Sequence, residues 1–200
     1  LAGGADVLTV GASGILTADV DMGADDDTVT LTTGAVVTGS LSGGTGTDSL
    51  ILTGDGTGTL DATIISNFQT LTKTGTGAWT VTGPVSVDDL AVDGGTLTFG
   101  NGTVATATVT NGATIDGATL EIATGSSLSV PTITGGTGSD QLIVHGTLTL
   151  ADPGAGNFAV DLGAGADELH WGALGAIDQA ATLGAGNDSF FLFSDATVSV

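Results

Sequence analysis

A short glycine-rich turn that ends in aspartate recurs along this chain at a nearly constant distance. It reads GGADVLTV at 3–10, GADDDTVTL at 23–31, GGTGTDSLIL at 43–52, GGTGSDQLIV at 135–144, GAGADELHW at 163–171 and GAGNDSFFL at 184–192. The last aspartates of these turns are separated by 21, 21, 92, 27 and 21 residues, and they are Asp6, Asp27, Asp48, Asp140, Asp167 and Asp188. Since 92 equals four steps of 23, the sequence predicts one repeat of about 21 residues with small insertions.

Alternating apolar residues follow each turn. The positions two and four residues after each aspartate are apolar, and they are Leu8, Val10, Val29, Leu31, Leu50, Leu52, Leu142, Val144, Leu169, Trp171, Phe190 and Leu192. This period of two indicates short strands with one buried face. A second set of apolar residues also repeats after 21 residues, with Ile15 matching Val36 and Val20 matching Leu41.

Short strands that recur at a fixed long period and are joined by Gly, Asp and Asn turns are typical of solenoids. A coil of about 21 residues has room for three short strands and three corners. We therefore expect an all-β fold, a parallel β-helix of nine or ten coils that forms a rod of roughly 45 Å and occupies residues 1–200 as one domain. A β-sandwich is the competing interpretation, but its hairpins need not keep one register over many strands.

The composition narrows the classes of function. Asp and Glu number 22 against one basic residue, Lys73, so the formal net charge is −21. A negative field of this size disfavours nucleic acid and acidic membranes as partners, and leaves divalent cations and basic surfaces open. No cysteine is present, which excludes disulfides and thiolate metal sites. No apolar run approaches the ~20 residues of a membrane helix, so we expect no direct membrane insertion by this segment.

Residues 66–83, SNFQTLTKTGTGAWTVTG, resemble the passenger-associated repeat of bacterial autotransporters, the type V secreted proteins. The segment 87–102, VDDLAVDGGTLTFGNG, is similar to the usual continuation of that repeat, so the resemblance covers about a fifth of the chain. The matching residues of the first segment are Phe68, Leu71, Lys73, Gly75, Gly77, Trp79, Val81 and Gly83.

This resemblance implies a right-handed β-helical passenger that is exported across the outer membrane by a C-terminal β-barrel. It also implies a place on the bacterial cell surface or in the medium, and a role as an adhesin or as a rigid stalk. On the same basis, we expect the chain to be a fragment of a longer passenger whose translocator lies elsewhere. A host or neighbouring-cell surface protein or glycan is the expected kind of partner.

The stretch GGTGTDSLIL also matches the calcium-binding nonapeptide of RTX proteins, in which such repeats run in tandem. Here the motif occurs once in about 21 residues, which favours aspartates that cap corners of the coil. However, stacked carboxylates ~5 Å apart repel one another, and a cation would relieve that repulsion. An RTX-like calcium-binding module therefore stays open, with Asp6, Asp27, Asp48, Asp140, Asp167 and Asp188 as candidate ligands, and no other cofactor is expected.

Few other residues are candidates for catalysis or binding. The chain has no Arg, and the neighbouring Asp88 and Asp89 should point to opposite faces of a strand, so we expect no enzyme activity. Lys73 is predicted to pair with aspartates of neighbouring coils. Alternation predicts that His145 and His170 point outward.

The same alternation places Trp79 and Trp171 inward and leaves Phe191 outward, as a candidate contact surface. Threonine strings such as TVTLT (28–32) and TLTKT (70–74) raise a third function, ice binding. These strings are also what an ordinary outward strand face contains.

Overall fold

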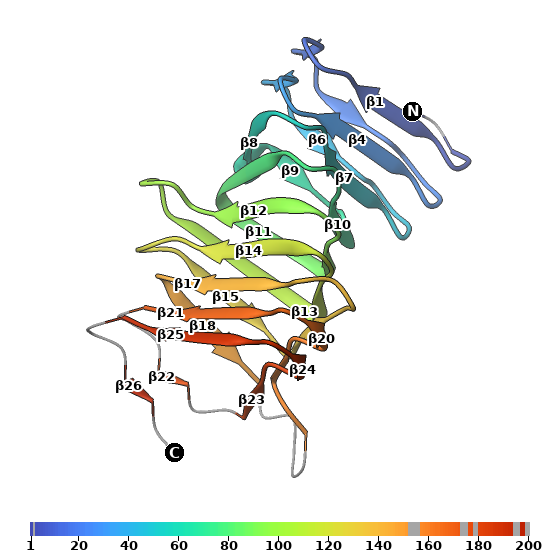
Figure 1. Cartoon of the computed structure of the whole chain (residues 1–200). Coiled ribbons are helices and arrows are strands. Elements are labelled where there is room, and N and C mark those ends of the chain that lie inside the picture. Colours follow the sequence, from blue (N-terminus) through green and yellow to red (C-terminus); the bar gives the residue numbers. More distant parts are fainter. Residues whose placement is uncertain (2, 152–156, 173–175, 178–179, 194–196, 199–200) are drawn as a thin grey trace.

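The chain winds along one axis, coil upon coil, with β1 and β25 at opposite ends of the stack (Figure 1). This computed structural model describes residues 1, 3–151, 157–172, 176–177, 180–193 and 197–198. It confirms an all-β solenoid with parallel strands that stack about 21 residues apart. The described part contains one short 3-10 helix, η1 (Ala62–Ile64), and no helix in it is long and apolar enough to cross a membrane.

Each coil passes through up to three sides, which we name the first, second and third sheets. The first sheet contains β1 (Val7–Val10), β4 (Thr28–Thr32), β7 (Ser49–Thr53), β10 (Thr70–Lys73), the end of β11 (Ala78–Val92), the end of β13 (Ala105–Ile115), β16 (Ile133–Gly135), β19 (Val160–Asp161) and β23 (Ala181–Thr182). The second sheet contains β8 (Thr57–Asp61), the start of β11, β12 (Gly95–Phe99), β14 (Ala118–Ile122), β17 (Gln141–Val144), β21 (Glu168–Trp171) and β25 (Ser189–Leu192).

The third sheet has two parts. The first coils contribute β3 (Val20–Asp21), β6 (Leu41–Ser42) and β9 (Ile65–Ser66), and later coils contribute the middle of β11, the start of β13, β15 (Ser127–Val130) and β18 (Thr147–Leu150). Shorter pairs complete the coils, and they are β2 (Ile15–Leu16) with β5 (Val36–Val37), β20 (Ala164–Gly165) with β24 (Ala185–Gly186) and β22 (Ala176–Ile177) with β26 (Thr197–Val198).

Inward side chains stack on equivalent side chains of the next coil. In the first sheet Val29, Leu50 and Leu71 lie in register and are at most 1% exposed. The predicted alternation is therefore confirmed in the interior coils. Phe190 and Leu192 are 46% and 51% exposed, because β25 has a described neighbour on one side only.

One large inward residue depends on a glycine of the preceding coil. Trp79 is buried in register with Gly58, and a Cβ atom on Gly58 would lie 2.7 Å from the indole ring. The indole Nε1 donates a hydrogen bond of 2.9 Å to the carbonyl of Thr53. Gly58 is therefore required by the tryptophan of the following coil.

The number of turns and the exposure of the second apolar column differ from what the sequence suggested. The solenoid has about eight turns rather than nine or ten, and equivalent positions of adjacent coils lie between 18 and 27 residues apart. The predicted pairs Ile15 with Val36 and Val20 with Leu41 are confirmed. Ile15 and Val36, however, are 70% and 48% exposed, so this column faces solvent.

We predict that deleting one whole coil leaves a folded rod. Removal of residues 28–48 joins Asp27 to Ser49, which occupies the position equivalent to Thr28, so every remaining strand keeps its register. Circular dichroism should show a cooperative β-sheet transition, and the rod should shorten by ~5 Å. Deletion of residues 28–37 is the control, because it shifts the register and should abolish cooperative unfolding. Equal behaviour of both deletions would contradict the in-register stack.

Candidate functional site

The six motif aspartates form two ladders on different sheets, which corrects the single register expected from the sequence. Asp6, Asp27 and Asp48 precede strands of the first sheet, and Asp140, Asp167 and Asp188 precede strands of the second sheet. The 92 residues between Asp48 and Asp140 therefore do not span whole coils. Insertions of different lengths change the phase of the repeat between the two groups.

Each ladder is built from hydrogen bonds between one carboxylate and the backbone of the preceding coil. Asp27 Oδ1 accepts from the N–H of Asp6 at 2.7 Å, and Asp48 Oδ1 accepts from the N–H of Asp27 at 2.9 Å. Next in the first ladder stands Gln69, whose Oε1 accepts from the N–H of Asp48 at 2.6 Å. A neutral amide thus accepts the same hydrogen bond, which shows that the position needs an acceptor oxygen rather than a charge.

The second ladder repeats this geometry. The carboxylate of Asp140 accepts hydrogen bonds from the N–H groups of Gly117 and Gly136. Asp167 Oδ1 accepts from the N–H of Asp140 at 2.9 Å, and Asp188 Oδ1 accepts from the N–H of Asp167 at 3.1 Å. Burial raises the pKa of Asp140 above its ordinary value, against the opposing effect of its two backbone hydrogen bonds. Corner capping therefore accounts for both oxygens of Asp140 and for Oδ1 of Asp27, Asp48, Asp167 and Asp188.

The second carboxylate oxygen is the unexplained part of these ladders. Oδ2 of Asp27, Asp48 and Asp167 is buried and has no hydrogen-bond partner among the described residues. Such an oxygen is costly to bury. Within the described ranges, no group of three or more His, Asp or Glu side chains is arranged to hold a metal ion.

Lys73 does not pair with aspartates, which corrects the sequence-based prediction. Its side chain is fully buried in register with Leu52 and Val92, at an inward position of the first sheet. Its Nζ donates to the carbonyl oxygens of Thr74, Gly75 and Gly94 at 2.7, 3.0 and 2.9 Å. Burial lowers the pKa of this ammonium below its ordinary value.

The remaining residues of the 66–83 segment have structural positions of the same kind. Phe68, Leu71, Trp79 and Val81 are buried in the interior. Gly75 and Gly83 have φ of 74° and 79°, which favours glycine, and a Cβ on Gly77 would lie 2.4 Å from the carbonyl oxygen of Gly56. Every residue of the pattern therefore either fills the core or forms a corner.

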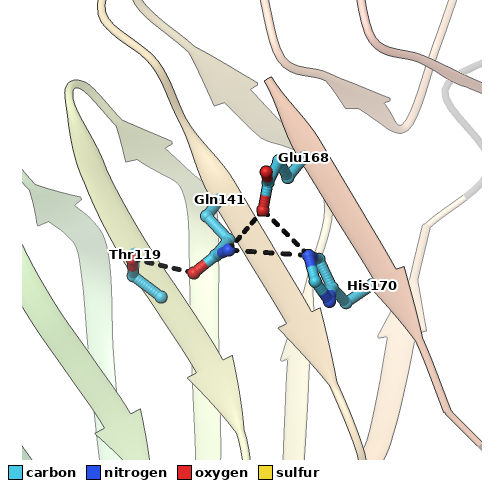
Figure 2. Close-up of polar contacts among 4 residues, drawn as sticks. All are labelled: Thr119, Gln141, Glu168 and His170. Atoms are coloured by element: carbon cyan, nitrogen blue, oxygen red, sulfur yellow. Dashed lines mark hydrogen bonds and ion pairs between the residues drawn. The ribbon is translucent and has the colours of Figure 1, made fainter. Parts of the chain in front are cut away.

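Interacting polar side chains gather instead on the outer face of the second sheet. Figure 2 shows a hydrogen-bonded row that crosses three strands, from Thr119 on β14 through Gln141 on β17 to Glu168 and His170 on β21. Gln141 Nε2 donates to Glu168 Oε2 at 2.6 Å, and His170 Nε2 lies 3.0 Å from the same oxygen. These contacts, that of His170 first, hold the pKa of Glu168 below its ordinary value.

A second His–Glu pair lies on the same face. His145 Nδ1 lies 3.6 Å from Glu121 Oε1, and Thr98 Oγ1 donates to Glu121 Oε2 at 3.2 Å. The rings of His145 and His170 both approach Phe193, with centroids 5.6 and 6.1 Å away, and His170 stacks on Phe191 at 4.4 Å. The sequence contains two His and two Glu residues, and all four are brought together on this face.

The sequence predicted part of this site. The outward direction of His145, His170 and Phe191 is confirmed, and Trp79 and Trp171 are buried as predicted. Glu121, Gln141 and Glu168 were not identified as candidates. Gln141 and Glu168 directly follow the motif aspartates Asp140 and Asp167, and that common position was the available signal.

Threonine strings do not form one continuous array. Thr28–Thr32 and Thr70–Lys73 belong to strands of the first sheet, but β7 lies between them and places Ile51 at the central outward position. The string at 79–82 lies on the second sheet. The described threonines are thus divided between sides of the coil.

Comparison with known proteins gave no match. No family model matches the chain, and neither a curated protein nor a solved structure matches it.

The ladder predicts that an amide can replace an aspartate but a methyl group cannot. Asp48→Asn keeps an acceptor for the N–H of Asp27, as Gln69 does for Asp48, and removes a buried charge. Asp48→Ala leaves that N–H without an acceptor, and should lower the free energy of unfolding by about 1–3 kcal/mol relative to Asp48→Asn. Urea unfolding measures both. Equal destabilisation of the two variants would show that the charge of the carboxylate itself matters.

The buried Lys73 should make the stability of the folded protein depend on pH in the alkaline range. Because burial lowers its pKa in the folded chain, the unfolded chain binds more protons between that pKa and the ordinary value of about 10.4. Stability of the natural protein relative to Lys73→Met should therefore rise as the pH increases from 7 to 10. Thermal midpoints of the two proteins measure this difference, in which the N-terminal amine cancels. If the natural protein instead loses stability relative to Lys73→Met as the pH rises, the prediction is wrong.

Proposed function

We propose that this chain is a non-catalytic surface module of the autotransporter passenger type, acting as a rigid stalk or an adhesive rod. The observation that carries the proposal is the unbroken succession of parallel coils, in which the described strands pair with the equivalent strands of adjacent coils. With a strand spacing of ~4.8 Å, about eight turns give a rod of ~40 Å. Such a stack resists bending because every coil is hydrogen-bonded to its neighbours.

The 66–83 segment supports the same proposal. Its residues resemble the autotransporter passenger repeat, and in this chain they fill the interior or form corners of the coil. A repeat whose residues all fill the core or form corners builds a rod, and a rod is suited to a passenger whose length is part of its function. Export across the outer membrane to the bacterial cell surface belongs to the proposal.

Surface charge bears on the partner. Lys73 is the one Lys or Arg residue of the sequence, and it is buried, so the surface presents no lysine or arginine side chain. With a formal net charge of −21, the rod repels phosphate-rich polymers and favours neutral or cationic partners. We assign adhesion to the outer face of the second sheet, which carries both His–Glu pairs and the exposed Phe191 and Phe193.

Display on cells tests the proposal. The chain, tagged with an epitope at its N-terminus, is fused to a signal peptide and an autotransporter barrel, and compared with the barrel carrying the epitope alone. We expect the epitope to become more accessible to antibody above the lipopolysaccharide, adhesion to increase, or both. The out-of-register deletion of residues 28–37 is the control and should lose the effect. A displayed, folded chain that changes neither readout would refute the stalk and adhesin roles.

A calcium-binding module is the second candidate, favoured by the buried, unpartnered Oδ2 atoms of Asp27, Asp48 and Asp167. Calcium bound to the folded state would raise the melting temperature, by an amount that grows with the logarithm of the calcium concentration relative to its Kd. The Asp48 variants therefore serve a second purpose when their unfolding is measured in excess calcium and in chelator. A calcium-dependent shift that Asp48→Asn abolishes supports this candidate, and the absence of a shift rejects it.

A further inference from the structure

A polar groove lies beside the His145–Glu121 pair on the outer face of the second sheet. Its volume is about 600 Å³, which falls within the range of small-molecule binding sites. The groove lies between outward side chains of the sheet and the turn that follows β12. The lining side chains that matter for binding are Thr98, Asn101, Glu121, Thr124 and His145.

The lining offers fixed hydrogen-bonding groups of both kinds. Glu121 is an acceptor, whereas Thr98, Thr124 and Asn101 both donate and accept. Thr98 and His145 contact the two oxygens of Glu121, at 3.2 and 3.6 Å, so its carboxylate is held in place before any ligand arrives. No lysine or arginine lines the groove.

Aromatic rings continue the groove toward the C-terminal end of the sheet. His145, Gly172 and Phe193 directly follow β17, β21 and β25, so Gly172 lies between the other two, and a Cβ on Gly172 would lie 3.2 Å from Cδ2 of His145. The absence of a side chain there lets the two rings approach to a centroid distance of 5.6 Å. Phe191 faces outward in register with His170 and is 43% exposed, and Phe193 is 42% exposed, so His145, His170, Phe191 and Phe193 form a ring platform on the outer face.

We propose that this groove and the ring platform form a binding site for a neutral oligosaccharide. The hydroxyl groups of a sugar match the mixed donors and acceptors of the groove, and its C–H faces can pack on the exposed rings. An acidic sugar would face Glu121, Glu168 and the negative field of the chain with no cation to receive it. The inference deepens the adhesive function proposed above and rests on it.

A peptide ligand fits this face less well. The strands beside the groove, β12, β14 and β17, pair in register on both sides within the sheet, so the groove itself has no free backbone edge to which a peptide strand could add. A basic protein would be attracted by the net charge of −21, but that attraction acts over the whole surface and does not single out the groove.

The test is calorimetry on the full chain with four hexasaccharide probes: cellohexaose, mannohexaose and the fully N-acetylated chitin hexamer as neutral sugars, and hexagalacturonate as an acidic one. We expect at least one neutral probe to bind and the acidic probe to fail. The variants His145→Ala, Glu121→Gln and Phe193→Ala should each weaken binding by about tenfold or more. Phe158→Ala is the matched aromatic control, because Phe158 is 46% exposed and immediately precedes Ala159 and β19 of the first sheet.

Three results would overturn the inference: no neutral probe binds, binding is unchanged in all three groove and ring variants, or Phe158→Ala weakens binding as much as they do. Melting curves of each variant exclude loss of fold as the cause.

A lysine-rich peptide is a further probe. If it alone binds, and salt abolishes that binding, the face belongs to a basic protein instead. Because calorimetry uses the isolated chain, a negative result removes the sugar site and leaves the displayed stalk to be judged by its own readouts.

Discussion

The hydrogen-bonded stacking of each coil on the next is the constraint on which the rest of this structure depends. Parallel pairing fixes the register, so an inward residue must fit the residues directly above and below it. Trp79 shows the force of this rule, because the indole is accommodated only where the preceding coil supplies Gly58. Lys73 shows that the register can also bury a charged residue, since it places Lys73 inward between Leu52 and Val92. Three carbonyl groups of the turns accept hydrogen bonds from its ammonium.

Corners impose a second constraint, because a turn between strands leaves backbone N–H groups that the sheets do not satisfy. The aspartate ladders supply the missing acceptors, one coil to the next, and Gln69 continues the first ladder with a neutral oxygen. The repeated motif is thus explained by backbone chemistry before any ligand is considered. What that chemistry does not explain is the second, buried oxygen of Asp27, Asp48 and Asp167, and this is where a cation site remains a proposal.

Stacking also determines where a solenoid can have a function. The interior is filled and most strand edges are paired with the adjacent coil, so recognition falls to outward side chains. On the second sheet, two His–Glu pairs, Gln141 and two exposed phenylalanines join the threonines on one face. Variation in one outward row changes the binding surface without disturbing the register beneath it, which is a property suited to an adhesive rod.

The sequence by itself determined the repeat, the strand alternation and the inward residues, because these depend on local spacing that is visible in the chain. From them follow the solenoid and the burial of Trp79 and Trp171. The burial of Lys73 was also encoded in its position two residues after Leu71, but its charge suggested solvent.

Only the tertiary structure decided which repeats share a side of the coil, since coils of unequal length shift the phase between Asp48 and Asp140. For the same reason it alone brought His145, His170, Glu121 and Glu168 onto one face. Their proximity comes from the stacking of strands 21 to 27 residues apart, and no local pattern records it.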